Sequence, residues 1–158
     1  MKKPWKILYK PGYQSISMCI KDLKKNKIIL SHWIEDIISN KKNDIKITNA
    51  KIELYRISLK DLGFKKPTTL KLVYKQILKL GFQLVPVDVA LRTRLYYKNQ
   101  KTGEWLRCAT PMKSMIDSDN VPHLPKLGKA LKRYFVETYW SYPGAIFHPH
   151  NEFLVCKY

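Results

Sequence analysis

The stretch PTTLKLVYKQILKLGF, residues 67–82, contains the clearest helix signal in the chain. Its apolar side chains recur at the three- and four-residue spacing of a helix that buries one face; they are Leu70, Val73, Tyr74, Ile77, Leu78 and Leu80. Thr68 or Thr69 is placed to cap the beginning of the helix, and Gly81 stands where a helix ends in a left-handed residue. The stretch predicts one central amphipathic helix.

Segments on both sides of this helix have the alternation and the aromatic or β-branched content of strands. KIELYRISL (51–59) precedes the helix. After it, LRTRLYY (91–97) and EWLRCAT (104–110) predict a hairpin closed by NQKTG, followed by strands at KRYFVETYW (132–140) and EFLVCKY (152–158). We therefore expect an α+β fold whose C-terminal half is mostly antiparallel sheet.

The first 40 residues predict a small unit of one strand (5–10) and two helices (15–27 and 32–40), with Ser15 and Ser31 as caps. The polar run KKNDIKITN that follows is the best candidate for a linker. The expected division is residues 1–40, a linker at 41–50 and an α+β domain at 51–158. The alternative, one compact domain overall, stays open at 158 residues.

The chain is strongly basic, with a formal net charge of +18. Such an excess attracts polyanions at long range. Lysine supplies 25 of the 30 cationic side chains, as the codons of an AT-rich genome would produce, so the charge has a second explanation without a partner. The hydrophobic content of 45% is enough for a packed core and excludes a disordered tail.

No run of about 18 apolar residues is present, and the basic start MKKPWKILYKPGY lacks the apolar region of a signal peptide. We expect a cytoplasmic protein without a membrane partner. Cys19, Cys108 and Cys156 are far apart and form no C-x-x-C motif. They predict free, mostly buried thiols rather than disulfides or a zinc site.

A combination of basic and aromatic residues predicts a surface for nucleic acid. Arginine and lysine neutralise phosphates, and aromatic rings stack on bases. The candidates lie on the exposed side of the central helix, on one face of the predicted hairpin and near residue 130; they are Lys71, Lys75, Lys79, Arg92, Arg94, Tyr96, Arg107, Lys129, Lys132 and Arg133. No motif for sequence-specific recognition accompanies them.

The stretch MIDSDNVPHLPKL (115–127) is the main candidate for chemistry. Asp, Ser, Asn and Pro favour a turn, and two aspartates are too few for a calcium loop. His148 and His150 point the same way if the chain there is extended, so they, with Asp119 or His123 nearby, are a second possible ligand set. Turns are the favoured interpretation of both segments, and we expect no catalytic residue, metal or cofactor.

The order of these motifs resembles a family of small uncharacterised bacterial proteins. The resemblance rests on ELYRISLKDLGF, KLGFQLVP, LRTRLYY, GEWLRCATPM, IDSDNVP and the Trp- and Pro-containing segment before EFLV. In that family the pattern reads ELGF…GEWL…DSDG, and this chain has Asn120 in place of the last glycine and Val85 in place of a cysteine. The resemblance covers most of the chain and implies no activity.

Three functions remain open from the sequence. The preferred one is a non-enzymatic factor that binds nucleic acid or associates with a nucleoprotein. The second is a protein-interaction or regulatory module for an acidic protein partner. The third is a metal-dependent hydrolase using Asp117, Asp119, His148 and His150.

Overall fold

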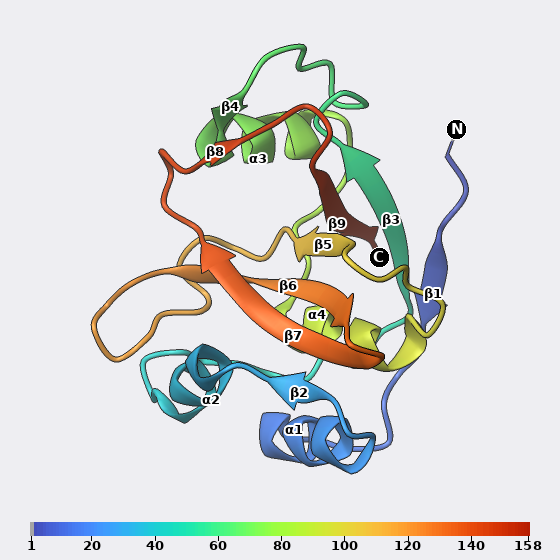
Figure 1. Ribbon diagram of the computed structural model, residues 1–158, viewed down its shortest axis with the longest axis vertical. Helices are drawn as coiled ribbons and strands as arrows, with labels where there is room; N and C mark the ends of the chain where they lie inside the picture. Colours follow the sequence, from blue (N-terminus) through green and yellow to red (C-terminus); the bar gives the residue numbers. More distant parts are fainter. Residues whose placement is uncertain (1) are drawn as a thin grey trace.

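A computed structural model describes residues 2–158 and has an α+β fold built on one mixed, mostly antiparallel sheet (Figure 1). The seven strands of this sheet lie in the order β1-β3-β9-β5-β6-β7-β2, and β4 pairs with β8 in a separate two-stranded sheet. In chain order the elements are β1 (Lys6–Leu8), α1 (Ile16–Lys25), β2 (Ile29–Leu30), α2 (His32–Ser39), β3 (Ile52–Ser58), β4 (Thr68–Thr69), α3 (Leu70–Lys79), α4 (Val87–Tyr96), β5 (Trp105–Cys108), β6 (His123–Ala130), β7 (Arg133–Trp140), β8 (Ile146–Phe147) and β9 (Glu152–Lys157).

The two faces of the main sheet bury different sets of side chains. On one face, α1, α2 and α4 pack over Leu106, Leu127 and Val136. On the other face, α3 and the β4–β8 pair cover the β3–β9 end through residues such as Tyr74 and Phe153. In Figure 1, α4 passes behind β6 and β7, while α3 lies above them and leaves their front uncovered. The front of β5, β6 and β7 is therefore the open part of the sheet.

The predicted fold class and most predicted elements are confirmed. The Ser15 and Ser31 side chains cap α1 and α2 by accepting hydrogen bonds from the N–H groups of Met18 and Ile34. Thr69 is the N-cap residue of α3, although its hydroxyl makes no capping bond. The strands predicted at 5–10, 51–59, 104–110, 132–140 and 152–158 correspond to β1, β3, β5, β7 and β9. The three cysteines are free and buried, as expected.

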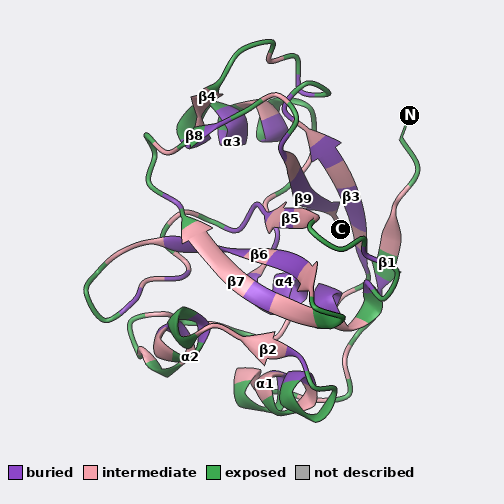
Figure 2. Ribbon diagram, viewed as in Figure 1, coloured by how far each residue is buried: buried purple, intermediate pink, exposed green. Residues whose placement is uncertain are grey.

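The strand predicted at residues 91–97 is wrong, because this segment forms the second half of α4. Every residue from Val87 to Arg94 is buried (Figure 2), whereas a half-buried strand would expose alternate side chains. The helix also accommodates its polar residues: Asp88 and Arg92, four residues apart, form a buried ion pair at 3.2 Å. The predicted hairpin of 91–97 with 104–110 therefore does not exist.

Strand β6 pairs with β5 on one side and β7 on the other, and β6 was not anticipated from the sequence. The β6–β7 hairpin turns through Leu131 and Lys132, whose φ angles are 50° and 59°. Two consecutive residues in this left-handed region are typical of a type I′ turn. This hairpin places the aromatic residues of β7 beside β6.

The segment between α2 and β3 has no helix or strand, and its side chains contact the later part of the chain. Thr48 donates hydrogen bonds to Asp88 from both its backbone N–H and its hydroxyl, each at 2.7 Å. The side-chain amide of Asn43 donates to the Ile116 carbonyl at 2.7 Å. Side chains of α1 and α2 share one buried cluster with those of β3 and α4.

Candidate functional site

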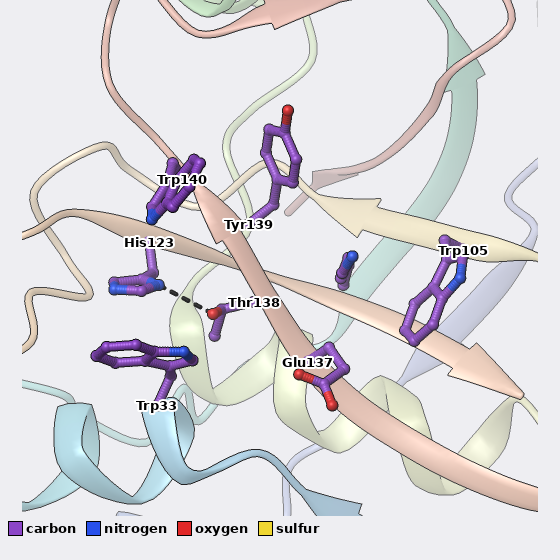
Figure 3. A pocket seen from close by; sticks show the side chains of 8 residues that line it. Trp33, Trp105, His123, Glu137, Thr138, Tyr139 and Trp140 are labelled. Atoms are coloured by element: carbon purple, nitrogen blue, oxygen red, sulfur yellow. Dashed lines mark hydrogen bonds between the residues drawn. The ribbon is translucent and has the colours of Figure 1, made fainter.

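The candidate site is an open cavity of about 430 Å³ around the C-terminal half of β7 (Figure 3). Half of the lining residues are Trp or Tyr, and one lysine, one glutamate, one threonine and one histidine complete it. The lining residues are Trp33, Trp105, His123, Lys126, Glu137, Thr138, Tyr139 and Trp140. They come from α2, β5, β6 and β7.

The outer edge of β7 is unpaired along this cavity in the part of the chain that the structure describes. β2 pairs with β7 only at Phe135 and Val136, and the Val136 carbonyl accepts a hydrogen bond from the Ser31 N–H at 3.0 Å. Backbone groups alternate in direction along a strand, so those of Thr138 and Trp140 also point outward, where no strand follows.

Successive side chains of β7 point to opposite faces of the sheet, so the cavity has two sides. We call the side that carries Glu137 and Tyr139 the open face, and the side that carries Thr138 and Trp140 the histidine side. In Figure 3, Trp140, His123 and Trp33 stand on one side of the β7 ribbon, and Tyr139 and Trp105 on the other.

On the open face, Trp105 lies flat across β6 because residue 128 is glycine. A Cβ atom at Gly128 would be 2.3 Å from the Trp105 ring. The Lys126 ammonium lies 4.6 Å from the centre of the Trp105 ring and 5.8 Å from that of Tyr139. Arg107, which is paired with Lys126 in the sheet, lies 5.8 Å from the same tyrosine ring. Aromatic rings and cations therefore alternate across three strands.

The cations of the open face have no carboxylate partner within 4.0 Å among residues 2–158. Arg107 makes no side-chain hydrogen bond to another described residue, and its Nε is buried without one. Burial lowers the pKa of Arg107. Burial, followed by repulsion from Arg107, lowers the pKa of Lys126, against a smaller opposite effect of Glu137. Two neighbouring cations without a carboxylate within 4.0 Å suit an anionic ligand.

On the histidine side, three polar side chains form a chain of hydrogen bonds. Asp117 Oδ2 lies 2.8 Å from His123 Nε2, and His123 Nδ1 lies 2.9 Å from the Thr138 hydroxyl. Asp117 and His123 are buried, whereas Thr138 is half-buried and lines the cavity. The Trp33 ring lies against the His123 ring with centroids 5.3 Å apart.

The segment 115–127 forms the turn expected of it and also supplies this chain of polar groups. Asp117 Oδ1 accepts hydrogen bonds from the N–H groups of Asp119 and Val121, each at 2.9 Å. Burial alone would raise the pKa of Asp117, but the hydrogen bonds from His123, Val121 and Asp119 outweigh it and leave that pKa below its ordinary value. Asn120 has a φ of 63°, a conformation that asparagine and glycine tolerate better than other residues.

Arg92 and Arg94 do not lie on a nucleic-acid surface, because both side chains are inside the protein. Arg92 is 3% exposed and pairs with Asp88. Arg94 is 1% exposed and donates hydrogen bonds to Gln100 Oε1 and to the carbonyls of Gly128 and Tyr97. The prediction failed at these two residues because α4 is a helix and not the outer face of a hairpin.

The other predicted nucleic-acid residues are accessible but lie on separate elements. Lys71, Lys75 and Lys79 are exposed on α3, and Tyr96 is exposed at the end of α4. Lys129 is half-buried, and Lys132 and Arg133 are exposed, at the β6–β7 turn. Arg107 alone of the predicted set lies beside the lining of the open face.

Most residues of the cavity carry no signal of a site in the sequence. Trp105, Trp140 and Tyr139 had been assigned only to strands, and β6 had not been assigned at all. The exception is the density of aromatic residues in KRYFVETYW, which the hydrophobic core does not use fully: Trp140 is 60% exposed.

The proposed metal ligands do not form a metal site within residues 2–158. No three His, Cys, Asp or Glu side chains of this part of the chain converge as a metal centre would require. His148 and His150 stack with ring centroids 5.9 Å apart on an exposed turn, and Asp117 binds His123. None of the helices in residues 2–158 has the length and apolarity needed to cross a bilayer.

Comparison with known proteins gives no relative from which a function can be transferred. No protein-family model, curated protein or solved structure matches the chain. The functional argument therefore rests on the geometry of the cavity.

Proposed function

We propose that the protein binds single-stranded nucleic acid on the open face of β5, β6 and β7. The observation that carries this proposal is the pair of cations, Arg107 and Lys126, which have no carboxylate within 4.0 Å among the described residues and lie among the rings of Trp105 and Tyr139. Phosphates would neutralise the cations while unpaired bases stack on the rings, which is how sheets with aromatic side chains hold single strands.

Three features support a nucleic acid over a small anion. The net charge of +18 gives the whole molecule a long-range attraction for a polyanion. The cavity, about 430 Å³ in volume, opens onto an uncovered sheet face (Figure 1), which leaves space for a ligand that extends beyond the cavity itself. Two aromatic rings, those of Trp105 and Tyr139, lie on the open face beside Lys126, which gives more than one base a partner.

The geometry favours single strands over duplexes. Trp105 lies flat on the sheet, and a ring in this position can meet the face of a base only when that base is not stacked inside a duplex. This function is the nucleic-acid binding expected from the sequence. The proposed surface is different: it is the uncovered face of the sheet and not the predicted hairpin.

The test is fluorescence anisotropy with labelled 12-nucleotide single strands of DNA and RNA at about 50 mM salt, where basic proteins usually bind. We expect Lys126→Gln, Arg107→Gln and Trp105→Ala each to weaken binding about 10-fold, in line with the loss of one stacking or phosphate contact. A duplex of the same length should bind more weakly than the single strand.

The matched control is the triple variant Lys71→Gln/Lys75→Gln/Lys79→Gln, which removes three exposed charges from α3 and leaves the sheet intact. It should reduce the dependence of affinity on salt but keep the preference for single strands. Equal losses of affinity in the control and in the open-face variants would mean that binding depends only on the overall charge of the protein. Absence of any nucleic-acid binding at low salt would refute the proposal. If the protein then bound an acidic protein and no nucleic acid, the protein-interaction alternative would be favoured.

A further inference from the structure

The histidine side of the cavity holds the groups of a nucleophilic catalyst in the order that the chemistry requires. A carboxylate accepts a hydrogen bond and cannot donate one, so the contact with Asp117 favours the His123 tautomer that carries its proton on Nε2. Nδ1 is then the acceptor and faces the hydroxyl of Thr138 at 2.9 Å. Hydroxyl, imidazole and carboxylate in this sequence are the parts of a triad, which is recognised by geometry and not by fold.

The carboxylate is held firmly enough to orient the imidazole. Asp117 is 1% exposed, and its second oxygen accepts two backbone N–H bonds at 2.9 Å. These bonds favour the ionised carboxylate, which is the form that stabilises an imidazolium. Asp117 is thus placed as a positioning residue, behind His123 and away from the cavity.

The cavity leaves space for a substrate beside the Thr138 hydroxyl. A backbone N–H group is also placed to donate a hydrogen bond to the oxyanion that would form during the reaction. Thr138 lines the cavity, and its backbone N–H points off the unpaired edge of β7. A free N–H of the nucleophilic residue itself is one of the usual donors to the oxyanion in acyl transfer. The rings of Trp33 and Trp140 stand on the two sides of His123 (Figure 3) and offer apolar surface to the substrate.

We propose that Thr138, His123 and Asp117 form a hydrolytic site for uncharged carboxylic esters with an aromatic leaving group. The aromatic group would lie on Trp33 or Trp140, and the ester carbonyl would lie at the edge of β7. This inference does not depend on nucleic-acid binding, because the cations proposed for that role lie on the opposite side of the strand.

The reaction follows from the proton positions. The Thr138 oxygen forms a bond to the ester carbon while its proton moves to His123 Nδ1, and the carbonyl electron pair moves onto the oxygen that faces the backbone N–H. The tetrahedral intermediate collapses, the bond to the leaving oxygen breaks, and the imidazolium returns its proton to that oxygen. Water then attacks the acyl-threonine with the same base and releases the carboxylic acid and free Thr138.

The first experiment measures release of p-nitrophenol from p-nitrophenyl acetate by the full chain. Thr138→Val, which keeps the shape and removes the hydroxyl, should lower kcat/KM at least about 100-fold, and Thr138→Ser should retain activity, since it keeps the nucleophile. Thr102→Val, on an exposed turn outside the cavity, is the control and should leave the rate unchanged.

The second experiment identifies the nucleophile by mass spectrometry after reaction with a fluorophosphonate. One adduct on Thr138, absent in Thr138→Val, would support the site. If Thr138→Val keeps its esterase rate, or if the adduct lies on another residue, the triad is only a set of structural hydrogen bonds and the proposal fails. Failure of both experiments would leave nucleic-acid binding unaffected, because that is measured separately on the open face.

The role of Asp117 has its own readout. Asp117→Asn should shift the pH at which kcat/KM rises, because an amide no longer holds the imidazole in the required tautomer or stabilises its charge. Circular dichroism would verify that this variant folds. A folded Asp117→Asn with an unchanged pH profile would remove Asp117 from the site.

Discussion

The side chains of Arg107 and Lys126 lie opposite each other on β5 and β6 with no carboxylate within 4.0 Å of either cation in residues 2–158. Burial of Lys126, followed by repulsion from Arg107, lowers the pKa of Lys126. A bound phosphate would compensate both charges. Anion affinity at this face should therefore fall as the pH rises toward the ordinary lysine range, and earlier than for a free lysine; titration of a short single strand between pH 7 and pH 10 measures it.

Lys126→Arg is the control for this pH dependence, since arginine keeps its charge throughout that range. The variant should bind with an affinity that stays level up to pH 10. A decline equal to that of the unaltered protein would show that another group titrates.

Gly128→Ala should destabilise the protein by about 1–3 kcal/mol, the range seen when a packed site is overfilled. The added Cβ would stand 2.3 Å from the Trp105 ring and force it off the sheet. Urea unfolding followed by tryptophan fluorescence measures the change.

The double variant Trp105→Ala/Gly128→Ala separates this contact from other effects of the new methyl group. Once the ring is absent, Gly128→Ala should lower the free energy of unfolding much less than it does in the unaltered protein. An undiminished cost in the Trp105→Ala background would mean that the glycine serves the backbone and not the ring.

Replacing the turn residues with Leu131→Asn/Lys132→Gly should stabilise the protein by about 1 kcal/mol. Both positions have positive φ, which disfavours leucine and lysine and suits Asn-Gly in a type I′ turn. Thermal unfolding monitored by circular dichroism gives the difference. Leu131→Ala alone should change little, because Leu131 is 88% exposed and alanine does not relieve the backbone; an equal gain from it would point to the side chain instead.

The free energy of unfolding should fall in acid because of Asp117. Its pKa is depressed in the folded state, so its contribution is fully present above its unfolded value of about 3.9 and is lost as the pH falls through the lower folded value. Urea denaturation between pH 6 and pH 2 measures the slope. Asp119→Asn, which alters an exposed carboxyl of the same turn, should leave the slope nearly intact; a large change there would contradict the assignment.

The sequence was sufficient where one periodicity dominated. The stripe of α3, the serine caps of α1 and α2 and the alternation of β3 and β9 led to the right elements. It was insufficient at α4, because LRTRLYY alternates as a strand does while tertiary contacts bury both of its arginines. The cavity could not be predicted either, because it depends on β6 and on the pairing of β6 with β7. The residues of β6 give no strand signal, since they include Pro125, Lys126 and Gly128.

A single strand, β7, separates the two sides of the cavity, and its residues point alternately into one side and the other. Because only this one strand lies between the two sides, a small displacement of β7 would move side chains on both sides at once. If occupancy of one side displaces β7, it changes the free energy of occupying the other side, and this thermodynamic linkage is equal in both directions.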